Sequence, residues 1–205
     1  MTEPSAIHLV IDSTVAIGTL AVAVLAIWGE WIRSVLAPAK LTIRPHTLKG
    51  DPTSSRGFQL MYYHLKVVNE RRWLPVTNCR VLLKGLSRRR PDGHFHAVPM
   101  AVPLQFVWAP AEVTPPVITV QSEHILDFGF VSEDSNRFAP VLYSYANNFE
   151  GYVGPNEAVR FHIEIEASNF SSTRYQVFEV SWDGTWSHDP TVMACHLIIR
   201  EIGPE

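Results

Sequence analysis

The stretch that decides the fold is Val159-Arg160-Phe161-His162-Ile163-Glu164-Ile165-Glu166, near the end of a chain of 205 residues. Apolar side chains occupy every second position, and charged or imidazole side chains occupy the positions between them. Because successive side chains of a strand point to opposite faces, this alternation predicts a strand with one buried and one hydrated face. A similar segment at residues 175–182 follows a turn-rich stretch, so we expect the two to form an antiparallel hairpin.

Further segments rich in β-branched and aromatic residues predict strands at residues 40–44, 58–69, 77–86, 104–108, 117–121, 125–131 and 193–201. Prolines and glycines fall mostly between these segments, as expected for turns. Residues 87–103 and 132–155 are expected to be long loops, and no helical period of useful length appears after Pro38. Residues 39–205 are therefore predicted to form one soluble domain, an antiparallel, immunoglobulin-like β-sandwich. A closed β-barrel is the alternative, which strand counting does not separate from a sandwich.

Residues 1–38 have a different character. Residues 13–29 carry no charged side chain, and as a helix they would span roughly 26 Å of the ~30 Å hydrocarbon core of a bilayer. Extending the helix back to Ala6 supplies the remaining length. Trp28 and Trp31 mark the boundary where indole rings favour lipid headgroups, and Arg33 follows them. The sequence thus predicts a single transmembrane helix, with an amphipathic extension that ends before Pro38.

The orientation of this helix is predicted from its basic flanks. No Lys or Arg precedes the apolar stretch, whereas Arg33, Lys40, Arg44 and Lys49 follow it closely. Since basic residues resist translocation, the amino terminus is expected outside and the β-domain in the cytoplasm.

Charge is divided along the soluble domain. Residues 41–100 contain eleven basic and three acidic side chains, and residues 101–205 contain four basic and fourteen acidic ones. The favoured interpretation is that opposite charges face each other on neighbouring strands. The alternatives are a basic face turned towards anionic lipid, and head-to-tail self-association. The acidic half argues against nucleic acid as a partner, because phosphate binding needs many cations on one surface.

Candidate contact residues are few. Arg88, Arg89 and Arg90 precede a turn signal, and Trp182 and Trp186 flank an Asp-Gly turn, where they either close the core or line a groove. His94, His96, His188 and His196 make a metal centre a minor alternative that no spacing motif supports. Cys79 is expected to be buried, and both cysteines are expected to be reduced. The sequence contains no recognisable catalytic or cofactor motif.

The predicted function is therefore a single-pass, membrane-anchored binding or assembly module without catalytic activity or a cofactor. Its expected partners are membrane lipid, and a protein or a second copy of the chain. A membrane effector that senses a small molecule and oligomerises through its helix is the alternative, for which Gly18, Ala21, Ala23 and Ala26 offer small contact residues. A metal-dependent hydrolase ranks third.

Overall fold

The structure is a computed structural model that describes residues 6–36, 39–55, 57–135, 137–168, 170–172 and 175–203. Within helix and strand, the side chains of residues 6–10, 12, 30–36 and 171 lie outside this description. The chain divides into two compact units, Met1–Pro38 and Ala39–Glu205. Each unit is described by itself.

The first unit contains one helix, α1, over Ala6–Leu36. It continues past Trp28 and ends before Pro38, as predicted from the restriction that a proline places on the preceding residue. Within the described residues, no helix combines the length and the hydropathy needed to cross a membrane. The transmembrane span predicted for residues 13–29 is not supported by this finding.

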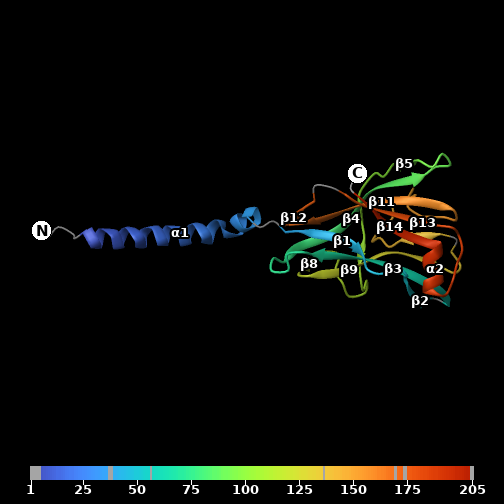
Figure 1. The fold of residues 1–205 in the computed structure, drawn as a ribbon, viewed down its shortest axis with the longest axis horizontal. Coiled ribbons are helices and arrows are strands. Elements are labelled where there is room, and N and C mark those ends of the chain that lie inside the picture. The colour runs from blue at the N-terminus through green and yellow to red at the C-terminus, as the bar shows by residue number, and fades with distance from the viewer. Residues whose placement is uncertain are drawn as a thin grey trace. The chain divides into compact units, whose positions relative to one another are not determined.

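The second unit is mainly β and consists of antiparallel sheets packed as a sandwich (Figure 1). We call its two layers sheet 1 and sheet 2. Sheet 1 has the order β1-β3-β9-β10, with β2 paired to β3 and β7 paired to β9. Its strands are β1 (Leu41–Pro45), β2 (Asp51–Ser55), β3 (Phe58–Asn69), β7 (Val107–Trp108), β9 (Glu123–Ser132) and β10 (Phe138–Pro140).

Sheet 2 has the order β14-β13-β11-β4-β5, to which β12, β6 and β8 are added. The predicted hairpin is confirmed, since β11 and β13 pair antiparallel from Glu157↔Trp182 to Ile163↔Gln176. The strands of sheet 2 are β4 (Val76–Arg89), β5 (Phe95–Val98), β6 (Leu104–Gln105), β8 (Ile118–Val120), β11 (Glu157–Ala167), β12 (Phe170–Ser171), β13 (Gln176–Trp182) and β14 (Leu197–Ile202).

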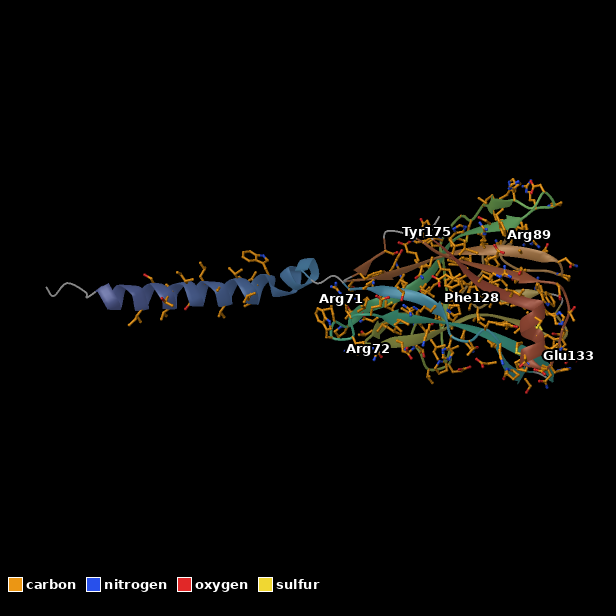
Figure 2. The ribbon with its side chains drawn as sticks, viewed as in Figure 1. Arg71, Arg72, Arg89, Phe128, Glu133 and Tyr175 are labelled. Atoms are coloured by element: carbon orange, nitrogen blue, oxygen red, sulfur yellow. The ribbon has the colours of Figure 1, made fainter. Side chains whose placement is uncertain are left out.

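Aromatic rings fill the space between the two sheets. Phe128 is fully buried, and the centroid of its ring lies 5.3 Å from that of Phe161 and 5.7 Å from that of Phe138. Phe106 and Phe178 are also within about 6 Å of it, at 5.9 and 6.1 Å. Figure 2 places Phe128 in the interior of the sandwich. Rings at these separations pack favourably in edge-to-face and tilted arrangements, and they contribute much of the apolar area that holds the sheets together.

One side chain links the open edge of sheet 1 to sheet 2. The side-chain amide of Gln176, on β13, donates to the carbonyl oxygen of Ile43 at 3.0 Å and accepts from the amide of Ile43 at 2.7 Å. Gln176 thus makes with β1 the pair of hydrogen bonds that a neighbouring strand would make. The two layers remain separate sheets, so the sandwich is the observed arrangement and the closed barrel is not.

Four predictions of local structure are wrong. The expected loop at residues 132–155 contains the short strand β10, which pairs with β9. Residues 193–196 are not strand but the end of a short helix, α2 (Pro190–His196), and β14 begins only at Leu197. Residues 104–108 are not one strand, because β6 pairs with β4 in sheet 2 whereas β7 pairs with β9 in sheet 1. The expected loop at 87–103 is largely the β4–β5 hairpin, in which Arg89 pairs with Phe95.

Candidate functional site

Arg88 is bound within the domain. It lies on β4, where its Nη1 is 2.5 Å from the Glu157 carboxylate, and its Nη2 donates to the carbonyl oxygens of Glu150 and Tyr152 at 2.7 and 2.9 Å. Glu150 and Tyr152 belong to the segment that leads into β11, and Glu157 is the first residue of β11. Arg88 therefore holds that segment against β4, and its guanidinium group is engaged in hydrogen bonds within the domain.

Arg89 and Arg90 are exposed. Arg90 closes the β4–β5 turn, since its amide donates to the carbonyl oxygen of His94, and its own carbonyl oxygen accepts from the amide of Gly93. The predicted basic loop thus separates into one structural arginine and two arginines at a hairpin tip. Figure 2 shows Arg89 near this tip, beside β5.

Trp182 and Trp186 both pack against the core. Trp182 is 3% exposed, and its indole N–H donates to the carbonyl oxygen of Thr185 at 3.0 Å. Trp186 is partly buried against the core, and its ring lies edge-on to His188. The turn between the two rings requires Gly184, whose φ is +93° and which approaches Pro155 so closely that a Cβ would lie 2.7 Å from the Pro155 side chain.

Two of the five predicted contact residues meet at Glu157. Trp182 is its cross-strand partner in the β11–β13 pair, and Arg88 is its ion-pair partner. The amide of Gly154 also donates to the Glu157 carboxylate, at 2.7 Å. This cluster closes one end of the core. It holds the end of the sandwich together and leaves little of Arg88 or Trp182 free to contact a partner.

The histidines considered for a metal centre lie in separate hydrogen-bonding groups. His196 contacts Asp183 at 2.7 Å, and His96 contacts Asp92 at 3.4 Å. Burial opposes ionisation of Asp183, but hydrogen bonds from His196 and Thr185 outweigh it and lower the pKa of this carboxyl. In the described part of the chain, no group of three or more His, Cys, Asp or Glu side chains is placed to hold a metal ion.

The charge division of the sequence becomes cross-strand pairing. On the outer face of sheet 2, Lys84 of β4 lies 3.2 Å from Glu164 and 2.8 Å from Glu166 of β11, and Arg80 also binds Glu166. The hydrogen bond from Lys84 and the one from Arg80 lower the pKa of Glu166. The basic strand β4 is thus neutralised by the acidic strand β11, which confirms the favoured interpretation of the charge pattern for these residues.

A cluster that the sequence did not predict lies on the outer face of sheet 1. His64 on β3 has Nδ1 2.9 Å from the nearly buried carboxylate of Asp127 on β9, and Nε2 3.4 Å from Asp51 on β2. The Nδ1 contact lacks hydrogen-bond geometry. Beside it, the ring of Tyr62 stacks on Phe130 at 5.3 Å. Burial and the negative charge of Asp127 raise the pKa of Tyr62.

Only part of this cluster could be read from the sequence. Alternation places Tyr62, His64 and Lys66 on one face of their strand, but which carboxylate lies opposite His64 depends on register. The register shifts by one residue between Tyr63 and His64, which pair with Gly129 and Asp127, and no residue pattern in the sequence marks this shift. The imidazole of His64 thus lies between the carboxylates of Asp127 and Asp51.

The two cysteines are free, and they differ in environment. Cys79 is buried as its phase on the strand predicted, and burial raises the pKa of its thiol to about 12. Cys195, on α2, is exposed. The Cys79 thiol is thus a small apolar core group and a poor nucleophile.

The most apolar exposed surface of the described residues belongs to α1. Its side chains Ile11, Val15, Ile17, Leu20, Val22, Leu25 and Ile27 are each more than half exposed, and so is Trp28 at 53%. Of the three residues predicted at the membrane interface, Trp28 is described. The side chains of Trp31 and Arg33 lie outside the described residues, although both positions belong to the helix.

Comparison of the chain with protein-family models, with curated proteins and with solved structures finds no match.

Proposed function

We propose that this protein is a membrane-anchored binding or assembly module, in which α1 is the anchor and the β-sandwich is a non-catalytic binding domain. The observation that carries the proposal is the apolar exposure of α1. Its described side chains from Ser13 to Gly29 include no charged residue, and the large apolar ones other than Val24 are 53–72% exposed.

The distribution of these side chains around α1 favours insertion into lipid. At 100° per residue, Ile11, Val15 and Val22 lie on one side of the helix, Leu20 and Ile27 lie opposite, and the remaining apolar residues lie between them. A helix that binds the surface of a membrane or of a protein is apolar on one side only. An apolar surface that surrounds the helix is best covered by a solvent that also surrounds it, namely hydrocarbon.

The proposed orientation places the amino terminus outside and the sandwich in the cytoplasm. Its support is the basic flank after the apolar stretch, where Lys40 and Arg44 belong to the start of the domain. Tethering would then raise the effective concentration of the sandwich for partners at the same membrane.

The proposed binding role of the sandwich is supported by which of its candidate contact residues are exposed. Arg89 and Arg90 stand exposed on the tip of a hairpin, whereas Arg88 and Trp182 hold the framework together. The immunoglobulin-like assignment is part of the same proposal and is supported by the two antiparallel layers. Sensing of a small molecule inside the sandwich is less favoured, because aromatic rings occupy the space between the sheets.

Flotation of the full chain with liposomes tests the anchor. We expect the chain to float with the vesicles and to remain bound after washes with high salt and alkaline carbonate. Leu20→Lys combined with Leu25→Lys places two charges near the middle of the apolar stretch, and each costs about 3 kcal/mol at the centre of a membrane helix. This variant is expected to leave the vesicles.

Val113→Lys is the matched control, because Val113 is an apolar side chain of the sandwich that is 78% exposed. It should float like the unaltered chain. A full chain that is monomeric in buffer without detergent, and that does not float, would overturn the proposal. Protease protection of a tag placed after Glu205, in intact cells, tests the orientation separately.

A further inference from the structure

Aromatic side chains from three segments of the chain gather on sheet 1. Tyr62 of β3 and Phe130 of β9 are cross-strand partners on its outer face, and the centroids of their rings lie 5.3 Å apart. Two further rings come from the segment after β10, namely Tyr143 and Tyr145, which are 41% and 44% exposed. We call these four residues, Tyr62, Phe130, Tyr143 and Tyr145, the aromatic face.

Hydrogen bonds hold the two tyrosines after β10 in place. The amide of Tyr143 donates to the carbonyl oxygen of Gln105 at 3.0 Å. The phenol of Tyr145 donates to the carbonyl oxygen of Pro140 at 2.6 Å, and Pro140 belongs to β10, which pairs with β9. The Tyr145 ring is therefore fixed beside the strand that carries Phe130, and the aromatic face is formed before any partner binds.

Carboxylates lie close to these rings. Burial raises the pKa of Tyr62, and the negative charges of Asp127 and Glu112 raise it further. Burial is also the main cause that raises the pKa of Tyr143, to which the charge of Asp127 adds. Glu112 is exposed, and among the described residues no cationic side chain contacts its carboxylate. The aromatic face therefore lies within the field of nearby negative charges.

The basic side chains on this side of sheet 1 do not outnumber the carboxylates. His64 is a single imidazole that contacts two carboxylates, those of Asp127 and Asp51. Lys66, on the same face of β3, lies 3.3 Å from the carboxylate of Glu123 and is matched by it. With the exposed carboxylate described above, the balance at the aromatic face is negative. Such a surface attracts a cationic partner.

The chain itself shows which cation stacks on its rings. The guanidinium carbon of Arg137 lies 3.9 Å from the centroid of the Tyr152 ring, and that of Arg160 lies 3.9 Å from the centroid of Phe95. The Tyr152 ring is nearly parallel to Tyr145, at 16° and 6.3 Å. Within the described part of the chain, no such cation lies over the rings of the aromatic face. These rings are therefore free to accept a guanidinium group from a partner.

We propose that the aromatic face binds arginine side chains from a basic segment of a partner protein. This inference rests on the proposed function only in its binding role for the sandwich, and it involves no residue of α1. A guanidinium group would stack on the exposed rings of Tyr143 and Tyr145, while the carboxylate of Glu112 would attract its positive charge. Arginine is favoured over lysine, because a guanidinium group is planar and stacks flat on a ring, whereas an ammonium group is compact.

Fluorescence anisotropy with a labelled oligo-arginine peptide tests this surface, with the full chain in a neutral detergent. A second peptide contains citrulline in place of each arginine, which keeps the planar end group and removes its charge. A third contains lysine. We expect the citrulline peptide to bind about tenfold more weakly than the arginine peptide or less, and the lysine peptide to have an intermediate affinity. High salt should weaken the binding, because the attraction is partly electrostatic.

Paired variants locate the binding on the aromatic face. Tyr143→Leu with Tyr145→Leu removes the two exposed rings but keeps apolar side chains, and it should weaken binding of the arginine peptide about tenfold. Tyr143→Phe with Tyr145→Phe keeps the rings and should retain the binding. Tyr175→Leu removes a tyrosine that is 50% exposed beside β11 of sheet 2, and it is the matched control that should bind like the unaltered chain.

Two further measurements do not depend on the folding of the leucine variant. Glu112→Gln should weaken the binding severalfold, whereas Asp92→Asn, which removes an exposed carboxylate of the β4–β5 hairpin, should not. Hydroxyl-radical footprinting of the unaltered chain, read by mass spectrometry, should show that the arginine peptide protects Tyr143 and Tyr145 from oxidation and leaves Tyr175 unprotected.

Equal affinity for the arginine and citrulline peptides would refute the inference, and so would oxidation of Tyr143 and Tyr145 that the arginine peptide leaves unchanged. A folded leucine variant that binds the peptide as well as the unaltered chain would also refute it. None of these results bears on the anchor, which the flotation with liposomes measures separately. Protection of the two tyrosines that rises with protein concentration in the absence of peptide would assign the face to a contact between copies and would overturn the inference.

Discussion

His124 is a residue of the sandwich whose side chain has a buried polar atom without a hydrogen-bond partner among the described residues. This atom is Nε2, and the residue lies on β9 with its ring edge-on to Trp108, at a centroid distance of 5.5 Å. Burial lowers the pKa of this imidazole below its ordinary value. The neutral ring is therefore the form that fits the folded protein.

This environment predicts a dependence of stability on pH. In the unfolded chain His124 takes up a proton at about pH 6.5. In the folded chain it does so only at lower pH. The unfolded state then binds more protons, so the contribution of His124 is present above about pH 6.5 and is lost as the pH falls through the folded pKa. His124→Phe, which keeps the aromatic contact, is expected to flatten the decline in unfolding free energy between pH 7 and pH 5.

Urea unfolding at a series of pH values measures this slope. His94→Phe replaces an exposed histidine and is the matched control. An unchanged slope in the His124 variant, or an equal change in the control, would contradict the prediction.

The environment of a residue could be predicted from the sequence where it depends only on the position of that residue in the alternating pattern of a strand. Cys79 was expected to face inward and does so. The role of Arg88 could not be foreseen, because it depends on carbonyl groups more than sixty positions away in the chain. The exposure of Trp73, on the turn between β3 and β4, could not be predicted either. No local pattern distinguishes an aromatic ring that points away from a turn from one that packs onto the core.

For the helices and strands, the prediction was correct where the local residue pattern is strong. Alternation and β-branched residues gave the bounds of β3, residues 58–69, as the structure has them. Four of the five residues of β2 are polar, the other is Pro52, and all five are exposed, so nothing in their pattern distinguishes them from a loop. Helix α2 did have a signal in Asp189-Pro190, a capping residue followed by a proline in the first turn, which was not recognised.

The segment before β11 provides an element-scale prediction. Arg88→Met removes the charged hydrogen bonds to Glu150, Tyr152 and Glu157 while it keeps an unbranched side chain. Hydrogen bonds to charged groups contribute roughly 1.5–3 kcal/mol, so we expect the free energy of unfolding to fall by about 2 kcal/mol. Arg89→Met and Arg90→Met alter exposed side chains and should stay within about 0.5 kcal/mol of the unaltered protein.

Denaturant unfolding of the three variants provides the comparison. Equal stability of all three would show that the Arg88 contacts contribute little. Loss of partner or lipid binding in the Arg89 and Arg90 variants, without loss of stability, would instead support the contact role predicted for the hairpin tip.

For the whole molecule, the division into two compact units predicts that the sandwich folds without α1. A chain that begins at Ala39 retains both sheets and the aromatic core. We expect its near-UV circular dichroism and its unfolding midpoint to match those of the full chain in detergent, and we expect it to remain in solution when vesicles float. Aggregation, or loss of the near-UV signal, would show that the sandwich needs the helix in order to fold.

The hydrogen bonds of Gln176 have a consequence for how this molecule coexists with its own copies. An uncovered edge strand is a template on which further chains can add, the first step towards fibrils. At Ile43 both backbone groups on the outward edge of β1 are already taken by an amide from the same polypeptide. Where many copies of the protein lie close together, these hydrogen bonds would hinder the addition of a strand from another copy, because the backbone groups with which that strand would pair are already bonded.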